Sequence, residues 1–170
     1  TGSDRLAIYF TGVKAGENFH QMNFDDSERT TLFFLGDMII PGNPPPSDQA
    51  KTSFLKELFQ PFTPGKLRQM KGFFYIIQVE PHKGSVKVYS SLFNILPVYY
   101  FAAADGYYVS SGIEPIRQSC PFPFTINKKF LLEKILFNYA LFNDTVIKEI
   151  RLLASNSYLE LAEKLEVKKH

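Results

Sequence analysis

The sequence contains no tryptophan, a single cysteine and no large excess of charge of either sign. Of its 170 residues, 19 are lysine or arginine and 17 are aspartate or glutamate, which gives a formal net charge of +2. Because these charges are interspersed, no field of one sign is available to attract nucleic acid or a membrane surface, and neither is expected as a partner. The single cysteine, Cys120, excludes a disulfide within the chain and fits a reducing compartment, so we expect a cytoplasmic protein.

Long apolar runs and clustered metal ligands are also missing. No apolar run approaches the roughly 20 residues that span a bilayer. The histidines at positions 20, 82 and 170 are separated from one another and from paired acidic residues, so the sequence predicts no metal site. Pro64-Gly65-Lys66 lacks the leading glycine and the following serine or threonine of a phosphate loop, so no ATP site is expected within these residues.

Hydrophobic residues make up 45% of the chain and aromatic residues 15%, enough for one sizeable core, and we expect a single domain over residues 1–170. Apolar, β-branched and aromatic runs bounded by glycine, proline or aspartate predict the strands. Turns are expected at residues 81–84 and at Asp105-Gly106. The expected strands cover residues 5–13, 19–24, 30–40, 72–80, 86–88, 98–102, 107–110 and 157–161, the last ending the chain.

Two helices are expected between these strands. The first follows a cap at Ser47 or Asp48, and a short helical turn is expected at residues 67–70. The second is capped by Thr125 and covers residues 127–139. Apolar side chains fall on one face of each helix, namely Phe54, Leu55, Leu58 and Phe59 in the first and Phe130, Leu131, Ile135, Leu136 and Tyr139 in the second. Antiparallel strands on both sides of a helical pair predict an α+β fold with two sheets and helices outside them.

Several segments, in order, resemble the amino-terminal glutaminase domain of the asparagine synthetase family. The segments P-V-Y-Y at 97–100 and S-G-I-E-P-I at 111–116 resemble the family's K-P-L-Y-Y and S-E-I-K-A-L. Residues 65–75 resemble its L-x-G-x-F-A-F strand, and residues 138–161 resemble T-x-F-x-G-I-x-R-L-P-P-G-x-Y-L. The resemblance implies the four-layer αββα sandwich of amino-terminal-nucleophile (Ntn) hydrolases, the fold to which class II glutamine amidotransferases belong.

The same resemblance implies an active site that this chain does not complete. The family uses an amino-terminal cysteine as nucleophile and its α-amino group as base, whereas this sequence begins Thr1-Gly2-Ser3-Asp4. The family's oxyanion-hole motif N-G-E-I-Y-N matches residues 35–40, so Leu35 replaces the asparagine, while Gly36 keeps a backbone N–H. Lys51 lies where an aspartate should bind the substrate ammonium, which a lysine repels. We therefore expect no catalytic residues and a vestigial ligand pocket formed by Leu35, Gly36, Asp37 and Lys51.

These observations favour a catalytically silent glutaminase-like domain that serves as a structural or interaction partner of a downstream synthetase domain in the same chain. ATP and magnesium would belong to that domain, leaving no cofactor here, and the full protein could be an ATP-dependent amide-forming ligase of the asparagine synthase type. One alternative is an active glutaminase whose amino-terminal cysteine is missing from this chain. Another is a stand-alone module that binds a small, amino-acid-like ligand. A homodimer is compatible with each. An amino-terminal nucleophile at Thr1 has little support, and Cys120, next to Pro121, is expected to be a packed, inert thiol.

Overall fold

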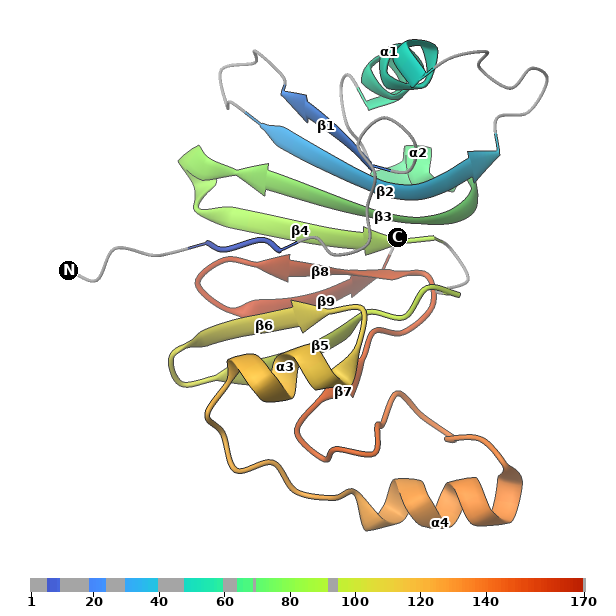
Figure 1. Ribbon diagram of the computed structural model, residues 1–170, viewed down its shortest axis with the longest axis vertical. Coiled ribbons are helices and arrows are strands. Elements are labelled where there is room, and N and C mark those ends of the chain that lie inside the picture. The colour runs from blue at the N-terminus through green and yellow to red at the C-terminus, as the bar shows by residue number, and fades with distance from the viewer. Residues whose placement is uncertain are drawn as a thin grey trace.

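The computed structural model describes residues 6–9, 19–23, 30–39, 48–59, 64–68, 70–91 and 95–169 (Figure 1). Within these ranges a large antiparallel sheet has the strand order β1-β2-β3-β4-β8-β9. A small antiparallel sheet has the order β6-β5-β7. The fold is therefore α+β with antiparallel sheets, as the sequence predicts. The large sheet consists of β1 (Phe19–Asn23), β2 (Thr31–Ile39), β3 (Lys71–Glu80), β4 (Ser85–Ser90), β8 (Ser157–Leu161) and β9 (Leu165–Lys169).

A close approach of backbones shapes the β2–β3 pair. The register places Gly36 opposite Phe74 and Met38 opposite Gly72. Gly36 and Gly72 adopt φ angles of +115° and +135°, which L side chains rarely adopt. A Cβ atom on Gly36 would lie 2.1 Å from the carbonyl oxygen of Phe73, so this position requires glycine. Gly36 and Asp37 therefore lie inside one continuous strand and do not end it.

The small sheet is a hairpin to which a later segment adds. It consists of β5 (Tyr99–Ala103), β6 (Gly106–Ser110) and the two-residue strand β7 (Arg151–Leu152). The helix α3 (Ile113–Ser119) follows β6 directly and lies against the hairpin (Figure 1). The sequence analysis missed this helix, although Pro115 in its first turn is compatible with a helix start.

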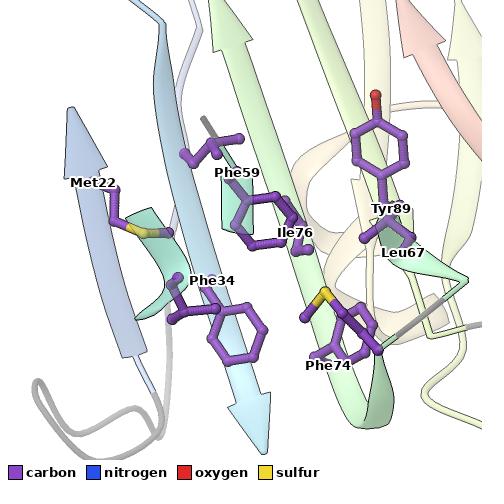
Figure 2. Packing of buried hydrophobic residues seen from close by; sticks show 10 residues of the cluster. Met22, Phe34, Phe59, Leu67, Phe74, Ile76 and Tyr89 are labelled. Carbon is purple, nitrogen blue, oxygen red and sulfur yellow. The ribbon is translucent and has the colours of Figure 1, made fainter. Parts of the chain in front are cut away.

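Buried apolar side chains of the described residues form three clusters, which show what each face of the sheets contacts. The first joins Leu55 and Phe59 of α1 (Asp48–Phe59) and Leu67 of α2 (Pro64–Leu67) to one face of the large sheet (Figure 2). Another lies between the sheets and includes Val88 and Leu159 of the large sheet and Val98 beside the small one. The remaining cluster packs the other face of the small sheet against α3, loop residues and the buried Cys120. Its buried members are Phe101, Ile116, Cys120, Ile147 and Ile150.

The helix α4 (Lys128–Phe137) differs from the other helices because it lies away from both sheets (Figure 1). It begins after Asn127, whose side-chain oxygen accepts a hydrogen bond from the N–H of Phe130 at 3.2 Å, and it ends at Asn138 in the left-handed conformation. The expected cap, Thr125, is wrong because its hydroxyl binds the carboxylate of Glu149 at 2.6 Å. Most side chains of the expected apolar stripe are not covered by the described residues: Leu131, Ile135, Leu136 and Tyr139 are exposed.

Other expected elements need smaller corrections. Residues 6–9, part of the expected first strand, belong to no strand, and the rest of that strand lies outside the described residues. The helical turn expected at residues 67–70 is α2, three residues earlier. The chain does not end with its strand at residues 157–161, because β9 pairs with β8 after a turn. The expected turn after β3 forms as the 3-10 helix η1 (Pro81–Lys83), closed by Gly84.

Candidate functional site

The residues expected to form a vestigial pocket are divided between two sides of the large sheet. Phe34 in β2 packs with Leu55 and Phe59 of α1 in the first cluster. Because side chains alternate along a strand, the half-buried Leu35 and the exposed Asp37 project from the opposite face. Lys51 belongs to α1, on the Phe34 side, and its side chain lies outside what the structure describes.

Leu35, Gly36 and Asp37 thus stay together on β2, whereas Lys51 belongs to an element on the other side of the sheet. Gly36 lies opposite Phe74 on β3. The one thiol of the chain, on Cys120, is 5% exposed in the cluster between the small sheet and α3, and it is not on the strand that carries Leu35. This confirms the expectation of a packed cysteine. Thr1 lies outside the described residues.

A second polar site, which the sequence analysis missed, is built around Glu80 at the end of β3. The Glu80 residue is 4% exposed, and its carboxylate accepts hydrogen bonds from Gln78 Nε2 at 3.1 Å and Ser85 Oγ at 3.0 Å. Lys87 Nζ donates at 2.7 Å and Lys83 Nζ at 3.4 Å. Both carboxylate oxygens of this buried glutamate are therefore satisfied, as a buried charge requires.

Electrostatics around this site favour the ionised glutamate and the neutral tyrosine beside it. Burial raises the pKa of Glu80, but the hydrogen bonds from Lys87 and Ser85 and the charges of Lys87 and Lys83 outweigh it, so the pKa lies below its usual value. The Tyr89 hydroxyl donates to Gln78 Oε1 at 3.2 Å. Burial raises the pKa of Tyr89, which therefore stays protonated.

These groups form a structural network rather than a reactive one. The Glu80 carboxylate is neutralised by lysines, and Gln78 and Tyr89 use their polar atoms on each other and on Glu80. A general base needs a lone pair free to take a proton from a substrate. The sequence signal was the polar pair Gln78 and Glu80 at alternate positions of a strand whose same face carries the buried Phe74 and Ile76.

Thr145 holds together the turn formed by residues 145–150. Its buried hydroxyl lies 2.8 Å from the carbonyl oxygen of Ile147 and 2.9 Å from that of Ile150, and it accepts the N–H of Ile147 at 3.1 Å. These bonds fold residues 145–150 into a compact turn. The turn places Ile147 and Ile150 in the cluster against the small sheet.

Comparison with known proteins identifies no family for this chain. Neither a scan against protein-family models nor a search of curated proteins finds a match. Over the described residues, no helix is long and apolar enough to cross a membrane. In the same part of the chain, no group of three or more histidine, cysteine, aspartate or glutamate residues could hold a metal ion.

Proposed function

We propose that this chain is a catalytically silent glutaminase-like domain of the asparagine synthetase type, which supports a downstream synthetase domain in the same polypeptide. The order of contacts supports the fold that this proposal needs. The helices α1 and α2 pack on the large sheet, the large sheet on the small sheet, and the small sheet on α3. This order is compatible with a four-layer αββα sandwich of the Ntn hydrolase class.

The segments that carry the resemblance also meet in space. Residues 97–100 lead into β5, and residues 138–161 contain β7 and β8. The register pairs Tyr99 with Leu152 and Tyr100 with Arg151, and the N–H of Leu153 donates to the carbonyl of Val98 at 2.8 Å. Two segments that resemble the family separately are thus neighbours in the small sheet, which supports the resemblance of the chain to this family.

The chemistry around β2 is the observation that supports a catalytically silent domain. Leu35 presents an apolar side chain where the family has an amide donor, and the cysteine of the chain is buried elsewhere. Loss of one oxyanion donor costs a factor of about 10²–10³ in turnover. Without that donor and with no thiol beside Leu35, the described residues cannot form and stabilise a thioester from glutamine. ATP and magnesium would be bound by the downstream domain.

The test is to isolate the natural polypeptide, measure its intact mass, read its first residues and assay glutamate release from glutamine. We expect a mass far above that of 170 residues, no initial cysteine, and release no faster than in a Cys120→Ser variant. An initial cysteine together with glutamate release would replace the proposal with an active glutaminase. A natural chain of this size would replace it with a stand-alone binding module.

A further inference from the structure

Exposed apolar side chains concentrate on one part of the molecule. Among the described residues, ten of the sixteen exposed large hydrophobic side chains lie between Phe122 and Phe142. Ile135 is 80% exposed and Phe142 is 67% exposed. Exposed apolar side chains gathered in one region are a feature of interaction sites. We name it the α4 surface, defined by Leu131, Leu132, Ile135, Leu136, Tyr139 and Phe142.

Helix α4 buries a charged side chain and exposes apolar ones, the opposite of what α1 and α2 do. Within this helix, all of which the structure describes, Glu133 is the buried residue. Its carboxylate accepts the N–H of Leu141 at 3.1 Å and pairs with Lys129 at 3.5 Å, and Lys129 also pairs with Asp144 at 3.2 Å. Residues 141–144, which follow α4, are thus bound to its polar side by Glu133 and Lys129. This leaves the apolar side chains of α4 exposed.

The charged side chains near the α4 surface differ in whether they are paired within the protein. The nearby carboxylates are bound within the protein. Glu133 and Asp144 form ion pairs with Lys129, and Glu149 accepts hydrogen bonds from the N–H and hydroxyl of Thr125. By contrast, the exposed Lys128 and Lys134 make no ion pair within the described residues. Two copies joined through this face would bring lysines together, whereas a partner with carboxylates at its rim would complement them.

The distribution around the helix favours a concave protein partner over a flat one. At about 100° per residue, Leu131 and Ile135 lie roughly 40° apart on one side of α4. Phe137 projects roughly 120–160° away from them by the same spacing, and it is also exposed. A lipid surface covers one side of a helix, while a groove covers several, and anchors at i and i+4 are typical of helix-in-groove recognition.

We infer that the α4 surface docks into an apolar groove with an acidic rim on another folded protein domain. If the proposed function holds, on which this choice of partner rests, that domain is the synthetase domain that follows in the same polypeptide. Leu131 and Ile135, spaced at i and i+4 on α4, enter the groove, Tyr139 contacts it just beyond the end of the helix, and Lys128 and Lys134 pair with carboxylates at its rim. The contact would bury the apolar side chains that the described part of the chain leaves in water.

The test is amide hydrogen exchange in the natural polypeptide, followed through peptides that cover residues 128–142. A helix of this length is marginal when uncovered, so docking should make its amides exchange slowly. We expect the double variant Leu131→Asp/Ile135→Asp to exchange at least about tenfold faster over these residues, without change in β3. Charge reversal at Lys128 and Lys134 should act in the same direction. Ile95→Asp, at an exposed apolar residue outside the α4 surface, should change nothing there.

Each other outcome overturns the inference in a distinguishable way. A longer polypeptide in which α4 exchanges rapidly and the double variant has no effect would remove the docking but leave the proposed function standing. A polypeptide without a further domain would remove both. Protection that rises with protein concentration would assign the surface to a second copy. Protection that appears only with phosphatidylserine vesicles would assign it to a membrane.

Discussion

The large sheet and α4 solve the problem of hydrophobic burial in opposite ways. In β3, Phe74 and Ile76 are fully buried beneath the helices that cover the sheet (Figure 2). In α4 the leucine and isoleucine side chains are exposed, and the buried residue is a glutamate. The sheet region therefore gains its stability from apolar burial within the chain, while α4 is held by hydrogen bonds and ion pairs at its polar side. Regular secondary structure in this protein is therefore stabilised in two different ways.

This difference between buried and exposed apolar side chains indicates which region of the molecule can bind a partner. A surface that exposes leucine and isoleucine gains nothing for the stability of the isolated domain, because about 25 cal/mol per Å² of apolar area is gained only on burial. The polar network around Glu80 shows the converse, since every partner is supplied by the chain itself. The completed site is structural, and the incomplete surface is the one that can bind.

Paired truncations give the largest effect that separates the two regions. Phe74→Ala removes a ring that is 0% exposed, so we expect a loss of about 3–5 kcal/mol in the free energy of unfolding. Ile135→Ala removes a side chain that is 80% exposed and should change it by less than about 0.5 kcal/mol. Urea denaturation followed by circular dichroism measures both. Similar losses at the two positions would show that α4 is covered in the isolated chain.

The same contrast explains which elements could be predicted from the sequence. Strands β1 to β6 and α1 follow period-2 and helical apolar patterns, and the structure confirms them because these patterns are satisfied inside the chain. The pattern in α4 predicted the helix correctly but not the exposure of its apolar side chains, since periodicity shows which side chains share a face but not what covers that face. β9 was missed because its Leu165 and Val167 alternate with charged residues at the exposed edge of the sheet.

The candidate sites were harder to predict. Leu35, Gly36 and Asp37 were located on one strand, but the sequence could not show that the helix carrying Lys51 packs on the other side of the sheet. The Glu80 network depends on Lys87 and Ser85, which come from the neighbouring strand β4 and meet Glu80 only through the β3–β4 register. Contacts of this kind depend on tertiary structure and leave only a weak trace in a single sequence.

The two buried glutamates offer a second, smaller contrast. Glu80→Gln removes a carboxylate bound by lysines and Ser85, so we expect a loss of about 1–3 kcal/mol near neutral pH. The folded-state pKa of Glu80 lies below its usual value of 4.5, so its contribution is fully present above that pH and is lost as the pH falls through the folded-state pKa. The gap between wild type and variant should therefore narrow below pH 4.5.

Glu133→Gln is the matched variant in α4. Its amide oxygen can still accept the N–H of Leu141, so the variant loses only the ion pair with Lys129, which is itself exposed. We expect a smaller loss than for Glu80→Gln in urea denaturation at pH 7. If the gap for Glu80→Gln is constant between pH 7 and pH 3, the lysines do not hold its carboxylate in the ionised form.

The smallest expected effect concerns how α4 begins. Asn127→Ala removes the side-chain oxygen that accepts the N–H of Phe130, which should cost about 1 kcal/mol of helix stability. Thr125→Ala removes only the exposed bond to Glu149 and should cost less, because that bond competes with water. Since α4 lies away from the sheets, the loss at Asn127 should appear as faster amide exchange within residues 128–137 and leave β3 unchanged. Equal acceleration in both variants would show that the loop before the helix, rather than its cap, determines where α4 forms.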